Sequence, residues 1–291
     1  MMRKILTVFL FTVISVCSYA QVVKEPDATK YPEWTRPVDP FRIAGNLYYV
    51  GTADLGCYLI TTKSGHILIN TGLASSQTLI LNNIKKLGFK INDVKILLTT
   101  QAHFDHLGAM AAIKKVTGAK LLADYADVPV VEDGGLSDYD LDGKFRTFNP
   151  IKADRILHNG DHIVLGDINL TMLHHPGHTK GSCSYLFNVK DKSRTYRVLI
   201  ANLPTIVTDK DFNAIPAYPR IASDYAYTLA AMKKLKFDIW LASHGSQFNL
   251  LQKYKAAKNY NPSVFMDKQS YYQELNELED QYQKKLESQR R

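Results

Sequence analysis

The chain has 291 residues, of which 45% are hydrophobic, and it carries a formal net charge of +8 at pH 7. Its 36 basic and 28 acidic residues are scattered rather than gathered in a stripe, so the charge does not indicate a nucleic-acid-binding protein. Three cysteines are too few for a disulfide-built scaffold, and the length suffices for one large domain or two small ones.

The pattern of residues 1–20 predicts a secretory signal peptide. Two basic residues, Arg3 and Lys4, follow the initial methionines, and an apolar run from Ile5 to Cys17 then leads to small residues at the cleavage position. We expect cleavage after Ala20 and a periplasmic protein that is not attached to the membrane. A membrane anchor is one alternative, for which the apolar run is short. A lipidated Cys17 is another, for which the preceding Val16 is too bulky.

Short strands and helices alternate along the first half of the mature chain. Residues 21–40 are rich in proline and charge, which predicts an extended N-terminal arm. Period-two and helical spacing of apolar residues, punctuated by glycines, define the elements that follow. We predict strands at Ile43–Val50, Gly56–Thr61, His66–Asn70, Val94–Thr99 and Ala119–Ala123, and helices at Ser75–Leu87 and Ala109–Val116.

The segment Asp124–Pro150 breaks this rhythm with glycine turns and several aromatic residues. A connection of this length inside a domain is usually functional or mobile, so we expect it beside the site, where it would shape a substrate cleft. Further strands are predicted at Asp154–Leu157, Asp161–Leu165, Ile168–His174, Cys183–Asn188, Tyr196–Asn202 and Phe237–Ala242, with helices at Asp224–Leu235 and Ser270–Arg291. The last helix is polar, and we expect it to be solvated.

This order predicts an α+β fold in which two sheets pack face to face between helices, giving four layers. Each half of the chain contributes strands and then a helix. We therefore expect residues 21–291 to form a single domain, with the arm at its N-terminus and the polar helix at its C-terminus.

Potential metal ligands are concentrated in the loop after the apolar strand Val94–Thr99. His103, Asp105 and His106 fall within four residues, and imidazole and carboxylate groups packed this closely suit a borderline-soft cation such as zinc. The alternative is a polar turn that happens to hold two histidines, and the position after a buried strand argues against it.

Two further histidines follow predicted strands in the same way. His178 and His244 each stand directly before a small or turn-forming residue at a strand end. We expect these two to complete the metal site. His174 and His175 lie close by in sequence, but we expect them to be structural.

Four segments in this order resemble the metallo-β-lactamase superfamily: Asn70-Thr71-Gly72, Gln101–His106, Pro176–Thr179 and Ser243–Gly245. The resemblance covers nearly the whole mature chain and implies a four-layer αβ/βα sandwich with two mixed β-sheets flanked by helices. The segments Tyr218–Tyr225 and Asp238–His244 resemble the third subclass of the class B β-lactamases. Thioesterase and lactonase relatives carry a bridging aspartate in the stretch that corresponds to 198–208, which has no acidic residue here.

The resemblance implies two zinc sites. The first would use Gln101, His103 and His178, and the second Asp105, His106 and His244. A glutamine at the first position of the motif resembles the GOB-type branch of the subclass. Its amide oxygen is a neutral and weaker donor than imidazole, so we expect weaker or partial occupancy of the first site.

The activity that the resemblance implies is hydrolysis of the β-lactam amide bond in penicillins, cephalosporins and carbapenems, which confers antibiotic resistance. A metal-bound hydroxide would attack the ring carbonyl without a covalent enzyme intermediate. Asp105 would orient this nucleophile, and the hydroxyls of Thr205 and Ser223 are candidates for binding the substrate carboxylate. The alternatives are an exported zinc hydrolase acting on a lactone or thioester and a zinc-binding protein without activity. We expect a monomer.

Cys57 and Cys183 remain after removal of the leader. Both lie in apolar, strand-like surroundings, so we expect buried free thiols, with a disulfide as the alternative.

Overall fold

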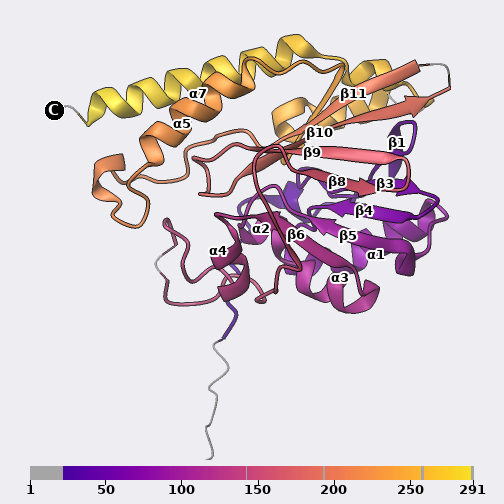
Figure 1. Ribbon diagram of the computed structural model, residues 1–291, viewed down its shortest axis with the longest axis horizontal. Helices are drawn as coiled ribbons and strands as arrows, with labels where there is room; N and C mark the ends of the chain where they lie inside the picture. The colour runs from indigo at the N-terminus through magenta and orange to yellow at the C-terminus, as the bar shows by residue number, and fades with distance from the viewer. Residues whose placement is uncertain (1–21, 142, 193, 257–258, 290–291) are drawn as a thin grey trace, which may run out of the picture.

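Two mixed β-sheets lie at the centre of the computed structural model (Figure 1). The structure describes residues 22–141, 143–192, 194–256 and 259–289, so the predicted signal peptide lies outside it. The first sheet has seven strands in chain order, from β1 to β7. They span Phe41–Ala44 (β1), Leu47–Tyr49 (β2), Tyr58–Thr62 (β3), Gly65–Ile69 (β4), Val94–Leu98 (β5), Lys120–Asp124 (β6) and Arg155–Leu157 (β7). Strands β1 to β4 pair antiparallel and β4 to β7 pair parallel.

The second sheet has five strands in the order β12-β11-β10-β9-β8. They span His162–Leu165 (β8), Ile168–His174 (β9), Cys183–Asp191 (β10), Arg194–Ala201 (β11) and Ile239–Ala242 (β12). Only the β11–β12 pair is parallel within this sheet. Its longest ladder joins β10 to β11, from Tyr185 opposite Ile200 to Asp191 opposite Arg194.

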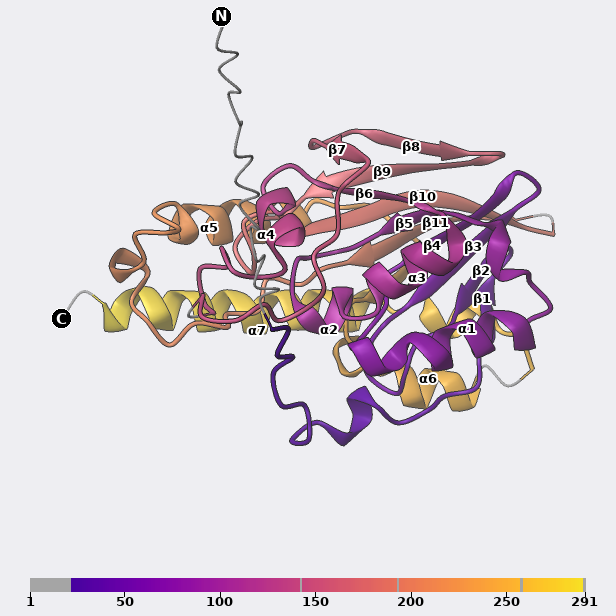
Figure 2. The same ribbon diagram turned by 90° about the horizontal axis from the view of Figure 1, so that it is seen from below.

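Helices cover the outer face of each sheet, which confirms the four-layer α+β architecture. Figure 1 shows α5 and α7 over the second sheet and α1 and α3 over the first, and Figure 2 shows α1 and α3 in front of the strands they cover. The helices span Gln77–Lys86 (α1), Phe104–Leu107 (α2), Met110–Thr117 (α3), Val128–Asp133 (α4), Ile221–Met232 (α5), Leu250–Ala256 (α6) and Lys268–Ser288 (α7).

The alternation of side chains along the first sheet divides its apolar residues between two cores. Leu59, Leu68 and Leu97 face the helical layer, where they pack with residues of α1 and α3. Their neighbours along the strands, such as Ile60 and Ile67, face the second sheet. Because successive strand residues point to opposite faces, a strand buried on both sides reads as a continuous apolar run.

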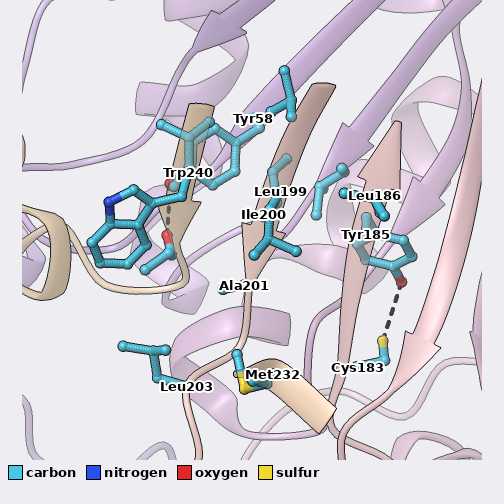
Figure 3. Packing of buried hydrophobic residues seen from close by; sticks show 14 of the residues in the cluster. Tyr58, Cys183, Tyr185, Leu186, Leu199, Ile200, Ala201, Leu203, Met232 and Trp240 are labelled. Atoms are coloured by element: carbon cyan, nitrogen blue, oxygen red, sulfur yellow. Dashed lines mark hydrogen bonds between the residues drawn. The ribbon is translucent and has the colours of Figure 1, made fainter. Parts of the chain in front are cut away.

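The core between the sheets also contains aromatic residues with hydrogen-bonded polar ends. Figure 3 shows Tyr58 of the first sheet near Trp240 of the second, and the Tyr58 hydroxyl donates to the Ala242 carbonyl at 2.6 Å. Cys57 and Cys183 are buried free thiols, which confirms the prediction, and the Cys183 Sγ lies 3.5 Å from the Tyr185 hydroxyl (Figure 3).

The structure departs from the predicted elements, or adds to them, in three places. The predicted strand Ile43–Val50 is a hairpin of β1 and β2, because Gly45 adopts a positive φ of 50° and turns the chain. The connection Asp124–Pro150 contains the short helix α4. Helix α7 is not solvated on all sides, because it buries a row of apolar residues spaced for a helix: Tyr271, Leu275, Leu278 and Tyr282.

Within the described residues, no helix is both long enough and apolar enough to span a bilayer. The carboxyl ends of β4 and β5 meet at the edge of the first sheet where α2 begins (Figure 1). The end of β12 is joined to this edge, since the Gly56 N–H donates to the Ser243 carbonyl at 2.9 Å. Loops from both sheets therefore converge at one place.

Candidate metal centre

The loop after β5 is held by the segment after β4. Asn70 has a positive φ of 60°, and its side-chain oxygen accepts the Thr100 N–H at 2.9 Å. The Thr71 N–H donates to the His106 carbonyl, also at 2.9 Å. These bonds fix both ends of the loop that carries Gln101, His103 and Asp105, so the positions of these side chains are set by backbone geometry.

One group of potential ligands consists of Asp105, His106 and His244, whose donor atoms all lie within 4.8 Å of one another. The Asp105 Oδ2 is 3.2 Å from His106 Nε2 and 3.3 Å from His244 Nε2. The first two residues lie in α2 and the third follows β12, so this group joins the two sheets. All three side chains are largely buried.

A second group lies on the other side of the same loop. His103 Nδ1 faces His178 Nε2 at 3.2 Å, and both rings are buried. Gln101 is also buried, and its Oε1 has no hydrogen-bond partner among the residues that the structure describes. The structure thus brings the two histidines together and leaves an unpaired amide oxygen on the same loop.

Each of three histidines is oriented through its remaining ring nitrogen. His244 Nδ1 lies 3.0 Å from Asp54 Oδ2, and His103 Nε2 lies 3.2 Å from Asp138 Oδ2. His178 Nδ1 donates to the Thr205 carbonyl at 2.8 Å. Such partners fix the ring and its tautomer, so the opposite nitrogen is presented as a lone pair to a metal ion.

The electrostatics of the site follow from burial and from its carboxylates. Burial opposes protonation of His244, but the adjoining carboxylates outweigh it and raise its pKa to about 9. For His103, burial is outweighed by Asp138, which also raises the pKa to about 9. Burial and the charge of His103 lower the pKa of His178 to about 3. In the absence of a cation, His103 and His244 therefore hold the positive charge that a bound metal ion would replace.

This donor set fits zinc. It offers four imidazole rings, one carboxylate and one amide oxygen, whereas magnesium and calcium prefer sites made of oxygens. The Gln101 Oε1 and both ring nitrogens of His106 are buried without a hydrogen bond within the described ranges. Leaving a buried polar atom unpaired costs about 1–3 kcal/mol. Coordination of a cation would satisfy the Gln101 oxygen and the His106 Nε2, which lies toward Asp105.

A pocket of 310 Å³ opens over both groups. Its walls include Tyr31 and Trp34 of the arm and Phe104 of α2, together with Leu141 from the long connection after β6. The expectation that this connection lies beside the site is therefore confirmed. Thr205 also lines the pocket, and no lysine or arginine does so among the residues placed by the structure.

Ser223 does not line this pocket, in contrast to Thr205. It lies in the first turn of α5, where its hydroxyl donates to the Arg220 carbonyl at 2.8 Å. The residue lines a separate cavity of 460 Å³, between α5 and the segment around Tyr125. Ser223 belongs to the segment Tyr218–Tyr225 that resembles the subclass, but in the structure the helix turns its hydroxyl back onto the backbone.

His174 and His175 are structural, as expected. His174 Nδ1 lies 2.8 Å from Asp124 Oδ2, and His175 Nδ1 lies 2.8 Å from the Ser184 hydroxyl. Neither residue lines the pocket over the two groups.

Trp34, Asp54 and Asp138 belong to the site without having been predicted from the sequence. The Trp34 indole N–H donates to Asp54 Oδ2 at 3.0 Å, so the arm supports the carboxylate that orients His244. Asp54 lies between two glycines, Gly51 and Gly56, and Asp138 lies in the aromatic-rich connection. The nearby glycines and aromatic residues are the sequence features that could have marked Asp54 and Asp138 as candidates for the site.

Solved structures of two β-lactamases superpose on most of the chain. GOB-18, a metallo-β-lactamase from Elizabethkingia meningoseptica, is 57% identical, with a TM-score of 0.90 over 92% of this chain and 99% of its own. LRA-12, a class B3 di-zinc metallo-β-lactamase from an Alaskan soil metagenome, is 61% identical, with a TM-score of 0.89 over 91% of this chain and 100% of its own.

Residues 57–191 match the family model of the metallo-β-lactamase superfamily. An acyl-coenzyme A thioesterase from Gallus gallus is 28% identical over 180 residues, which are 57% of this chain and 61% of the thioesterase. The similarity thus spans less than two thirds of this curated relative, whereas it spans the two β-lactamase structures almost completely.

Proposed function

Because this chain belongs to the metallo-β-lactamase superfamily and is 57% and 61% identical, over about nine tenths of its length, to two solved metallo-β-lactamases, we propose that it is a zinc-dependent β-lactamase. It would hydrolyse the amide bond of penicillins, cephalosporins and carbapenems and so confer resistance to them. The observation that carries the proposal is the convergence of Asp105, His106 and His244 beside the facing pair His103 and His178.

We assign two zinc sites to these residues. The first is held by Gln101, His103 and His178, and the second by Asp105, His106 and His244. The hydrogen bonds to the outer nitrogens of three of the histidines support this assignment, because they direct the inner nitrogens toward the ion. Gln101 is the weakest donor of the set, so the first site is the weaker of the two.

Zinc, when bound, supplies Lewis acidity and lowers the pKa of water toward 7. Asp105 is the residue that positions the attacking water. Burial would raise its pKa, but the imidazole rings of His106 and His244 hold that pKa well below its usual range. The carboxylate therefore stays ionised, and it would orient the water by accepting a hydrogen bond from one of its O–H groups.

The pocket orients the substrate mainly through apolar contact and through charge. Trp34 packs 5.7 Å from the His244 ring and 6.2 Å from the Phe104 ring, centroid to centroid, and forms a rigid aromatic wall. Thr205 is the remaining candidate for contact with the substrate carboxylate, although its hydroxyl already lies 2.9 Å from His178 Nδ1. No lysine or arginine lines the pocket among the residues that the structure places, so bound zinc, rather than a cationic side chain, would supply the attraction for an anionic substrate.

The lactone or thioester hydrolase is not favoured. The thioesterase relative shares 28% identity over 57% of the chain, against 57% identity over 92% for GOB-18. At the end of β11, where such relatives would carry a bridging aspartate, stands Asn202, whose Oδ1 accepts a hydrogen bond from Ser243 at 2.9 Å. This position therefore serves to hold the strand end before His244.

Hydrolysis of the chromogenic cephalosporin nitrocefin tests the proposal. We expect turnover that is abolished by a chelator and restored by zinc, and an Asp105→Ala enzyme that is slower by about 100-fold or more, as for loss of a positioned catalytic group. Asp280→Ala, on the exposed side of α7, is the matched control and should behave as the wild type. Chelator-resistant turnover, or near-native rates in Asp105→Ala, would contradict the proposal, and faster turnover of a lactone or thioester would support the alternative.

We further propose that the protein is exported to the periplasm, that residues 1–20 are removed, and that residues 21–291 act as a single monomeric domain. The support for export is the basic and apolar leader in the sequence. The support for a single domain is that residues of both sheets and of α5 and α7 share one core.

A further inference from the structure

Asp127 is a buried carboxylate that the proposed chemistry does not use. It follows β6 and directly precedes α4, and its side chain is 1% exposed. Within the described residues it forms no ion pair with a lysine or arginine. A buried charge without a cationic partner is costly unless hydrogen bonds compensate it.

Three donors converge on this carboxylate. Its Oδ2 accepts the Ala102 N–H at 2.9 Å and the Thr179 hydroxyl at 2.7 Å, and its Oδ1 accepts the Gly181 N–H at 2.7 Å. Ala102 stands between Gln101 and His103, and Thr179 directly follows His178. One side chain thus holds the two loops that supply all three proposed ligands of the first zinc site.

Only an acceptor can fill this position. A carboxylate accepts through both oxygens and donates through neither, whereas an asparagine would turn an NH₂ group toward one of the backbone N–H groups. The backbone at Gly181 also packs closely against the Asp127 side chain. A Cβ at Gly181 would lie 2.7 Å from the Asp127 Cγ and 2.4 Å from its backbone nitrogen, so this approach requires glycine.

The stems of the two loops are joined separately. The Cys183 N–H donates to the Thr100 carbonyl at 2.8 Å, and the Tyr185 hydroxyl donates to the Thr99 carbonyl at 2.7 Å. These bonds lie at the strand ends, before Gln101 and after Thr179. The contacts of Asp127 lie farther out, next to the ligands themselves.

We propose that Asp127 is a positioning residue of the first zinc site: it sets the distance between the loop of Gln101 and His103 and the loop of His178. The inference rests on the proposed zinc site. The amide of Gln101 is a weak zinc donor and adds little to the affinity of this site. The affinity therefore depends more on the three ligands being held in the binding geometry before the ion binds. The second site has its ligands on α2 and after β12, neither of which Asp127 contacts.

The test is a zinc titration of the metal-free protein against a chromophoric competitor, which gives two stepwise affinities. In Asp127→Asn we expect the weaker step to lose about 10–100-fold in affinity, as is typical when a group supporting a metal ligand is removed. The stronger step should stay within about threefold of the wild type. Repeating the titration in a His244→Ala background, which lacks a ligand of the second site, assigns the affected step.

Asp124→Asn is the matched control. Asp124 is also 1% exposed and ends the same strand, but its carboxylate bonds to His174 and to the Ala126 N–H rather than to the ligand loops. We expect both zinc steps to be unchanged in this variant. Thr179→Val removes a single donor to Asp127 and should weaken the same step to a smaller extent, so it carries the test if Asp127→Asn does not fold.

Two outcomes would overturn the positioning role: both steps within threefold of the wild type in Asp127→Asn and Thr179→Val, or both steps weakened by the same factor. Equal weakening would mark Asp127 as a residue of general stability. A wild-type protein that takes up no zinc would instead overturn the proposed function, and the positioning role with it.

Discussion

At the scale of the residue, Gln101 is what distinguishes the first of the two proposed zinc sites from the second. An amide oxygen carries no formal charge and is a weaker zinc donor than imidazole, but it needs no deprotonation before it binds. In the structure its Oε1 is buried and unpaired, whereas the carbonyl of the same residue accepts a hydrogen bond from the Thr99 hydroxyl at 2.6 Å. The backbone is thus anchored while the side-chain oxygen is left available.

Replacement of Gln101 by histidine should strengthen the first site. We expect the weaker zinc step in Gln101→His to tighten by about tenfold or more, and nitrocefin turnover at limiting zinc to rise, because imidazole is the better donor. The measurement is a stepwise zinc titration of the two proteins. Gln101→Ala, which has no donor, should move the same step in the opposite direction.

An unchanged titration in both variants would show that the Gln101 side chain does not coordinate the ion. A crystal structure with excess zinc gives an independent check, because a coordinating oxygen should lie about 2.0–2.2 Å from the metal.

At the scale of the element, helix α7 shows how a polar segment acquires a structural role. Its buried residues recur on one face, and the Tyr271 hydroxyl donates to the Met232 carbonyl at the end of α5 at 2.9 Å. The Tyr282 hydroxyl donates to the Ala222 carbonyl near the start of α5, also at 2.9 Å. The two helices are therefore bonded near both ends of α5, and α7 also contacts β12.

Loss of packing under α7 should destabilise the protein without changing its chemistry. Leu275 is fully buried, so we expect Leu275→Ala to lower the free energy of unfolding by about 2–5 kcal/mol, as measured in urea. Asn276→Ala, one residue on and exposed, should change it by about 0.5 kcal/mol or less. No residue of α7 lines the described metal pocket, so zinc-saturated turnover should be retained in both variants.

A Leu275→Ala protein as stable as the wild type would contradict the role of α7 as a packed layer. Loss of turnover in a variant that remains folded would indicate that α7 acts on the site.

At the scale of the whole molecule, the sandwich places loops from both sheets around one pocket. The proposed ligands follow β5, β9 and β12, so they come together only when the two sheets are packed. The arm completes the site, since Trp34 bonds to Asp54 and Glu25 Oε1 accepts the Ala74 N–H at 2.7 Å beside the metal loop. If zinc binds only the folded state, its binding should therefore stabilise the whole fold.

Export of the full-length chain gives a test at this scale. On expression in a Gram-negative host, we expect β-lactamase activity in the periplasmic fraction and a purified protein whose mass corresponds to a chain starting at Gln21. Light scattering after gel filtration should give the mass of a monomer. Activity that remains with the membranes, with a chain that retains Ile5–Cys17 or carries lipid on Cys17, would instead indicate an anchor or a lipoprotein.

The amino-acid sequence by itself predicted the fold class and the clustered ligands. The apolar strand before Thr99 and the histidines and aspartate after it are close in sequence, so their spacing already implies their proximity. The limits of β5, β9 and α3 lie within about one or two residues of those predicted, because period-two and helical spacing are local properties. Turns were harder to predict: the β1–β2 hairpin requires the positive φ that Gly45 adopts, which the apolar pattern does not reveal.

Only the tertiary structure decided which residues support the ligands and which do not. Asp54 lies 190 positions from His244, and Asp138 lies 35 positions from His103, so no local pattern could pair them. Ser223 shows the converse, because a hydroxyl in a suggestive segment points to its own helix and lines a different cavity. The sequence shows which side chains could bind zinc, because that depends on residue type. The orientation of those side chains depends on hydrogen-bond partners that come together only when both sheets have packed.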